Sequence, residues 1–235
     1  MSDAVRYELR DGLAVVRLDD GKANAVSFAL LGALEAALDR AEKEARALAI
    51  LGRPDRFSGG FDLGVMRGGD QAAVVRLVAG GGRLALRLFE GPLPVVLGCT
   101  GHALAMGAVL LLAGDLRIGA RGAYKIGLNE VAIGLTLPTF ATELASARLS
   151  PRHLQRATAL AEVYDPDGAV EAGFLDQTVA PAALEAAVVE AGARLAAALH
   201  PGAHRATKRR IRAATLERLR AGFEEDLAGI GTVAS

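Results

Sequence analysis

Two glycine-rich segments of the 235-residue chain have the residue composition of a ligand-binding or catalytic turn. The first, 57–63 (FSGGFDL), follows an apolar run, and its paired glycines let the backbone turn sharply with N–H groups facing a ligand. The second, 101–109 (GHALAMGAV), opens an apolar stretch, and the start of a buried helix there would present unpaired N–H donors and a positive dipole end. If parallel strands bring the two turns together, we expect a pair of donors for an oxyanion.

A third segment, 124–138, supplies a candidate base. Glu130 stands there among mostly apolar neighbours. Burial would disfavour the charged carboxylate and raise its pKa, which suits a general base near neutral pH. The local sequence is equally compatible with an exposed glutamate on a loop.

The elements that must position these segments alternate between short apolar strands and helices. Residues 5–18 indicate a hairpin that turns at Asp11-Gly12, and Ser27 is a suitable cap for a helix over 28–43. Buried strands are expected at 47–51, 94–99 and 115–119, and helices at 72–89, which Gly80-Gly81-Gly82 interrupts, at 108–113, and over most of the chain from about 150. This order predicts an α/β fold with helices packed on a largely parallel sheet.

Composition excludes several classes of protein. The chain has 27 basic and 27 acidic residues, so it lacks the positive electrostatic field that would hold a nucleic-acid backbone. Its single cysteine, Cys99, excludes an internal disulfide framework. The four histidines have no metal-ligand spacing, so no metal is expected. The longest apolar stretch, 103–114, is too short to span a bilayer, and no targeting signal is evident, so we expect a cytoplasmic protein that does not enter the membrane.

Taken in order, the motifs resemble those of the enoyl-CoA hydratase/isomerase family, also called the crotonase superfamily. The loop at 57–63 resembles the family's F-S-x-G-x-D-L, and 101–119 resembles its G-x-A-x-G-G-G…D-x-R-I-A stretch. The segment from Glu130 to Pro138 resembles P-E-x-x-x-G-x-x-P, and 22–27 (KANAVS) resembles K-x-N-A-x-S. The resemblance covers about residues 5–215 and implies a crotonase-like spiral of ββα repeats that acts on acyl-CoA thioesters.

The resemblance also implies roles for particular residues. The backbone N–H groups of Phe61 and Met106 correspond to an oxyanion hole that binds the thioester oxygen, and Glu130 corresponds to a catalytic glutamate. The family often has glycine where Met106 stands. No cofactor is implied, because CoA is part of the substrate. The remaining substrate and CoA contacts that we expect are Ala23, Arg56, Ser58, Gly59, Gly60, Asp62, Leu63, Gly107, Val109 and Lys208.

Val109 departs from the pattern of the family hydratases, and this difference bears on which reaction the protein catalyses. Family hydratases hold water between two glutamates, and the first of them corresponds to Val109, which can neither accept a proton nor orient water. Asp115 and Glu143 are the acidic residues closest in sequence, and neither is an obvious substitute. The run 126–130 closely resembles mitochondrial-type Δ3,Δ2-enoyl-CoA isomerases, which need a single base. We therefore expect an isomerase; the alternatives are an enoyl-CoA hydratase of fatty-acid oxidation and a catalytically weak acyl-CoA-binding paralogue.

The C-terminal part of the chain is expected to form a separate helical region. We assign residues 1–195 to the spiral core and 196–235 to charged helices that pack on a neighbouring subunit, as in the trimers or dimers of trimers of the family. The basic run Lys208-Arg209-Arg210-Ile211-Arg212 is a candidate for the CoA phosphates, with a solvated charged face as the alternative.

Overall fold

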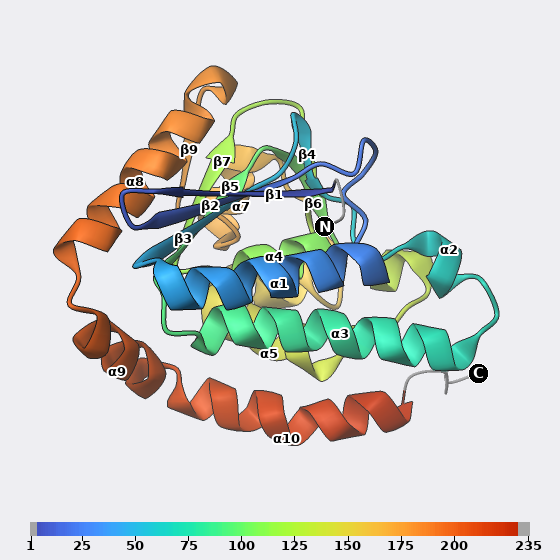
Figure 1. The fold of residues 1–235 in the computed structure, drawn as a ribbon. Coiled ribbons are helices and arrows are strands. Elements are labelled where there is room, and N and C mark those ends of the chain that lie inside the picture. Colours follow the sequence, from blue (N-terminus) through green and yellow to red (C-terminus); the bar gives the residue numbers. More distant parts are fainter. Residues whose placement is uncertain (1–3, 230–235) are drawn as a thin grey trace.

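The computed structural model describes residues 4–229 and contains two sheets with helices packed around them (Figure 1). The larger sheet has the strand order β1-β2-β3-β5-β7-β9, and only the β1–β2 pair is antiparallel. Its strands are β1 (Val5–Arg10), β2 (Leu13–Leu18), β3 (Ala47–Leu51), β5 (Val95–Cys99), β7 (Leu116–Ala120) and β9 (Gln177–Val179). The smaller sheet is parallel, with the order β4-β6-β8, and consists of β4 (Asp55–Ser58), β6 (Gly101–Leu104) and β8 (Ile126–Gly127).

The chain repeats a strand–strand–helix unit. After the β1–β2 hairpin and the helix that follows it, there are three units in which the first strand joins the larger sheet and the second joins the smaller one, before a helix follows. The helices that follow are α2 (Leu63–Met66) with α3 (Gln71–Glu90), then α4 (Met106–Ala113), then η1 (Val131–Ile133) with α5 (Thr139–Arg148). The predicted α/β spiral of ββα repeats is confirmed.

Local sequence signals explain the first turn and the first helix of the chain. Asp11 and Gly12 both have positive φ, 47° and 81°, which is the backbone that a two-residue turn between right-twisted strands requires. Ser27 caps α1 (Phe28–Glu44), where its hydroxyl accepts a hydrogen bond from the Leu30 N–H at 3.2 Å.

The core lies on both faces of the larger sheet, because side chains alternate along each strand. Leu13 and Val15 of β2 pack with Val188 of α8 (Leu184–Ala198), whereas Ala14 and Val16 face the larger core formed with α1, α3 and α4. In Figure 1, α1 and α3 lie side by side below the sheet in this view, and α10 runs beneath them. Strands with two buried faces explain the apolar runs of the sequence.

α4 is central to this arrangement. All eight of its residues are buried, and it begins at Met106, two residues earlier than the sequence pattern indicates. Its apolar character therefore reflects burial on every side. Within residues 4–229, every helix is too short or too polar to cross a membrane.

The C-terminal helices pack on their own chain, which corrects part of the expected organisation. The remaining helices are α6 (Pro151–Ala157), α7 (Pro166–Ala172), η2 (Pro181–Ala183), α9 (Pro201–Ile211) and α10 (Ala213–Gly229). α10 packs against α5 and α3, with Leu216 and Leu219 in the core and Gly222 against Thr139. The boundary expected at residue 196 falls inside α8, whose apolar side covers the larger sheet. Packing on a neighbouring subunit stays a prediction for the outer faces of these helices.

A buried ion-pair cluster attaches α9 to the core. The Lys208 ammonium and the Arg212 guanidinium each lie 2.7 Å from a different oxygen of the Asp115 carboxylate. The same carboxylate accepts the Val95 N–H at 2.8 Å, so one side chain joins α9, the end of α4 and the start of β5. The structural interpretation of Asp115 is confirmed, and this carboxylate is not free for catalysis.

Candidate active site

The three segments selected from the sequence leave one edge of the smaller sheet. Ser58 of β4 pairs with Ala103 of β6, which pairs with Ile126 of β8, and all three strands are parallel. The carboxyl ends of parallel strands meet at the same edge, so the turns after β4, β6 and β8 emerge together. These turns carry the two candidate donors and the candidate base.

The Phe61 N–H is free to face a ligand. Val26 donates to the Gly60 carbonyl at 2.8 Å and accepts from the Asp62 N–H at 3.2 Å, which is the pattern of an isolated parallel bridge. In this pattern the amide of the bridged residue, Phe61, is directed away from its partner strand. We find no acceptor for this N–H among residues 4–229.

The Met106 N–H is free because of its position in a helix. Met106 is the first residue of α4, and first-turn N–H groups have no partner within a helix. The preceding residue, Ala105, provides no side-chain cap. Ala105 has φ 51° and ψ −124°, a strained backbone for a residue with a Cβ, and its own N–H donates to the Gly127 carbonyl at 3.0 Å. This strain sets the direction in which α4 begins.

Two glycines allow the donor turns to touch. Gly60 has φ 95°, and a Cβ there would lie 2.9 Å from the Ala105 Cβ and 3.6 Å from the Met106 nitrogen. A Cβ at Gly107 would lie 2.3 Å from the Ser58 carbonyl oxygen, so α4 can approach the end of β4 only with glycine at this position. The free N–H groups of Phe61 and Met106 therefore project from two turns in van der Waals contact.

Asn24 and Ser58 hold the first turn rigid from inside. The buried Asn24 amide donates to the carbonyls of Leu18, Arg56 and Phe57 at 3.0 to 3.2 Å. The Ser58 hydroxyl, fully buried, donates to the Asn24 carbonyl at 2.8 Å and accepts from the Gly60 N–H. Because both hydroxyl functions are used internally, the Ser58 side chain shapes the turn, and the expected contact between this residue and substrate stays a prediction.

Glu130 follows β8, directly before η1, and its side chain is half-buried. One carboxylate oxygen, Oε2, is buried without a hydrogen-bond partner among the described residues. Burial raises the pKa of the Glu130 carboxyl to about 7, and a hydrogen bond from its own backbone N–H opposes this rise. A carboxyl with this pKa is about half protonated near neutral pH, so it can both accept and donate a proton.

The other carboxylates considered from the sequence are already paired. Glu143 lies 2.6 Å from the Arg218 guanidinium, and Asp115 is held by the cluster described above. Val109 lies one turn after Met106 in α4 and is 1% exposed, within the core. The position that corresponds to the first glutamate of the hydratases is thus a buried apolar side chain.

Several other predicted contacts lie in the loops around the donor turn. Ala23 accepts the Gly59 N–H at 2.9 Å, and a Cβ at Gly59 would lie 3.3 Å from the Ala23 Cβ, so these two residues are neighbours. Asp62 caps α2 by accepting the Gly64 N–H at 2.8 Å. Leu63 follows with 55% of its surface exposed, which leaves it accessible to a ligand.

The two predicted cationic contacts have different outcomes. Arg56 is half-buried at the start of β4, where its guanidinium donates to the Asp55 carbonyl at 2.9 Å, and its role stays a prediction. Lys208 is 3% exposed, and its ammonium donates to the carbonyls of Leu88 and Leu93 as well as to Asp115. Lys208 is therefore wrongly assigned to CoA binding, because a buried, fully paired ammonium offers nothing to a phosphate.

The glycine triplet Gly80-Gly81-Gly82, which the sequence pattern indicates as an interruption, lies within α3 and positions the donor residues. α3 is continuous from Gln71 to Glu90. A Cβ at Gly81 would lie 2.6 Å from Cε1 and Cζ of the Phe61 ring and 3.3 Å from the Met106 Cε. Gly81 thus lets the side chains of both donor residues pack against the backbone of α3.

We expect Gly81→Ala to lower kcat/KM by about 10- to 100-fold, because a displacement of about 1 Å at a catalytic group can cost that much. The added Cβ would push the Phe61 ring outward and move the attached N–H. Gly80→Ala is the matched control, since a Cβ there meets the flexible end of Leu31 at 2.8 Å and neither donor residue. Steady-state kinetics of both variants check the prediction, which is wrong if the two lose activity equally.

Comparison with known proteins agrees with this geometry. The family model described as enoyl-CoA hydratase/isomerase matches residues 8–231. The chain therefore belongs to the enoyl-CoA hydratase/isomerase family. Within the crotonase superfamily it is close to the enoyl-CoA isomerases.

Some individual relatives are named isomerases and others are named hydratases. Human mitochondrial enoyl-CoA delta isomerase 1 is 29% identical over 212 residues, which are 88% of this chain and 70% of the human one. A probable enoyl-CoA hydratase of Bacillus subtilis is 32% identical over 202 residues, covering 83% and 75% of the two chains. An apo structure of a Mycobacterium tuberculosis enoyl-CoA isomerase superposes with a TM-score of 0.91 at 44% identity, covering 97% of this chain and 99% of that one. A second structure of the same M. tuberculosis protein, named a probable enoyl-CoA hydratase, superposes with a TM-score of 0.93 at 44% identity and covers 97% of each chain.

Proposed function

We propose that this protein is a Δ3,Δ2-enoyl-CoA isomerase that uses Glu130 as its single base. The observation that carries the proposal is the half-buried Glu130 carboxyl with an unpartnered oxygen, together with the buried apolar side chain of Val109 in α4. A hydration mechanism of the family type needs a second carboxylate to hold water, and the corresponding position is apolar. The isomerase name of the human relative supports the same choice, whereas the M. tuberculosis protein carries both names and supports neither.

The proposed mechanism assigns one task to each group. The N–H groups of Phe61 and Met106 donate to the thioester oxygen of a 3-enoyl-CoA. The Glu130 carboxylate removes a proton from C2, and the electrons move toward the thioester oxygen, where the two donors stabilise the dienolate. The protonated Glu130 then returns the proton to C4, which gives the 2-enoyl-CoA. An apolar Val109 favours this reaction because it keeps water away from C3.

Each donor is expected to contribute substantially. Removal of one oxyanion-hole donor typically costs about 3 kcal/mol of transition-state stabilisation. Ala23, Leu63 and Arg56 are the proposed contacts for the rest of the acyl-CoA, because they surround the first donor turn and stay at least partly accessible.

Two substrates supplied separately test the proposal. We expect the protein to convert 3-enoyl-CoA to 2-enoyl-CoA and to leave 2-enoyl-CoA unhydrated on the same time scale. Hydration of 2-enoyl-CoA at a comparable rate would favour a hydratase, which the name of the B. subtilis relative makes the second candidate. Binding of both compounds without conversion would indicate a catalytically weak paralogue.

We further propose that the active form is a cytoplasmic homotrimer or dimer of trimers. The outer faces of α9 and α10 are available for a neighbour, with Ile211 77% exposed between them. Sedimentation equilibrium at micromolar concentration checks this assembly, and a stable monomer would contradict it.

A further inference from the structure

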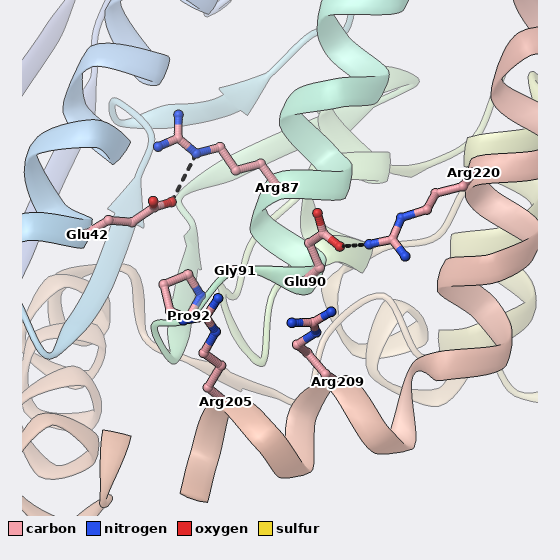
Figure 2. A pocket seen from close by; sticks show the side chains of 8 residues that line it. All are labelled: Glu42, Arg87, Glu90, Gly91, Pro92, Arg205, Arg209 and Arg220. Atoms are coloured by element: carbon pink, nitrogen blue, oxygen red, sulfur yellow. Dashed lines mark hydrogen bonds and ion pairs between the residues drawn. The ribbon is translucent and has the colours of Figure 1, made fainter. Parts of the chain in front are cut away.

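A charged cavity lies between the C-terminal end of α3 and the two C-terminal helices, apart from the donor turns (Figure 2). Its volume is about 270 Å³. Four arginines and two glutamates line it, namely Arg87, Arg205, Arg209, Arg220, Glu42 and Glu90. The lining therefore carries a net charge of two positive, although the whole chain is neutral.

Two of the four guanidiniums are paired inside the protein and two are free. Arg87 lies 2.6 Å from Asp39 and 3.0 Å from Glu42, and Arg220 pairs with Glu90. Arg205 and Arg209 make no ion pair or side-chain hydrogen bond with any residue that the structure describes. In Figure 2 both side chains rise from α9 toward the cavity.

The geometry of α9 explains why these two cations are available. Lys208 and Arg212, four residues apart, face inward to Asp115. Arg205 and Arg209, also four residues apart, lie on an adjacent face of the helix, so they are neighbours of each other. The buried ion pairs fix the helix, and the free guanidiniums are consequently held at the cavity without a protein partner.

We propose that this cavity binds a phosphate group, with Arg205 and Arg209 as the primary contacts. A guanidinium group can donate two parallel hydrogen bonds to the oxygens of a phosphate. Two unpaired guanidinium groups also balance the roughly two negative charges that a phosphate group carries near pH 7. The volume of about 270 Å³ leaves room for a phosphate group together with water molecules that hydrate it. The adjoining crevice under Pro92 measures about 10 Å³ and leaves no room for a larger apolar group.

The site is separate from the proposed reaction. Along α3, Gly81 contacts the donor residues, whereas Arg87 and Glu90 lie six and nine residues further, about 9 and 14 Å along the axis. The inference therefore does not depend on which reaction the protein catalyses. Phosphate could reach the cavity as the free ion or as part of CoA, and the experiment distinguishes these sources.

Calorimetric titration of the full chain with inorganic phosphate at low ionic strength tests the proposal. We expect saturable binding that weakens at least tenfold in the R205Q/R209Q variant and weakens with added salt, because the cavity is open to solvent. R210Q is the matched control, since Arg210 is exposed on the same helix and does not line the cavity. E90Q removes the carboxylate that neutralises Arg220, so we expect it to bind phosphate about two- to threefold more tightly.

A second titration with CoA identifies the source. If R205Q/R209Q loses phosphate binding but keeps CoA binding, the site takes the free ion; if both fall together, it takes a phosphate of CoA. Thermal unfolding of each variant confirms that the exposed substitutions leave the fold intact. The proposal is overturned if the wild type binds no phosphate, if binding survives in R205Q/R209Q, or if R210Q weakens it as much.

Discussion

Glu130→Gln is expected to lower turnover at least about 100-fold, with substrate binding little changed. Glutamine keeps the shape of the side chain and its capacity for hydrogen bonding but cannot accept the C2 proton. Steady-state kinetics with 3-enoyl-CoA measure the effect on kcat and KM separately. The expected loss lies in kcat, because the base acts only during proton transfer.

The pH dependence provides an independent readout of the same group. Burial raises the pKa of Glu130 to about 7, and the reactive form is the deprotonated one. We therefore expect kcat/KM of the wild type to rise tenfold per pH unit below about pH 7 and to level off above it. Glu130→Gln should lose this inflection from its residual activity.

Stability serves as the control for this variant. The Glu130 Oε2 is buried without a partner, so replacement of a charged group by a neutral amide should not lower the unfolding temperature at pH 8. A folded variant with near-normal turnover would remove Glu130 from the mechanism. A variant that unfolds early would point to a structural role instead.

Val109→Glu is expected to shift the reaction toward hydration and to destabilise the fold. The new carboxyl would stand where family hydratases hold their first glutamate and could orient water toward C3. It would also bury an ionisable group in a helix whose residues are all buried, which should lower the free energy of unfolding by several kcal/mol unless the carboxyl is protonated. We expect a small gain in hydratase activity and a loss of isomerase selectivity.

Val109→Gln separates the charge from the size of the new side chain. Glutamine has the same volume and can hold water, but it cannot act as a base, so we expect destabilisation without hydratase activity. Assays of both reactions on protein shown to be folded by thermal unfolding give the comparison. If the wild type already hydrates 2-enoyl-CoA as fast as it isomerises 3-enoyl-CoA, Val109 does not determine the reaction and the hydratase alternative holds.

Local signals in the sequence determined much of the scaffold. The turn at Asp11-Gly12, the Ser27 cap and the apolar strands were all predictable, because each depends on backbone preferences or burial within a few residues. The three candidate segments were also predictable, since glycine pairs and an isolated glutamate in apolar surroundings are visible in the sequence. The short strands β4, β6, β8 and β9 carried no comparable signal and were missed, so the smaller sheet was not predicted.

The tertiary structure decided which of these residues can meet a ligand. Lys208 and Arg209 are neighbours in a basic run, yet one is buried against Asp115 and the other lines an open cavity. Ser58 stands in the motif but uses its hydroxyl inside the turn. Side-chain roles of this kind depend on partners 30 to 100 residues away, which local patterns do not contain.

The same reason applies to the catalytic geometry. Gly81 could not be assigned from its own helix, because its importance arises from Phe61 and Met106, which approach it only when β4, β6 and α3 are packed together. The raised pKa of Glu130 likewise follows from burial in the folded chain. Residue types and their spacing thus indicate which groups can act, whereas the direction, the exposure and the charge of these groups depend on long-range packing.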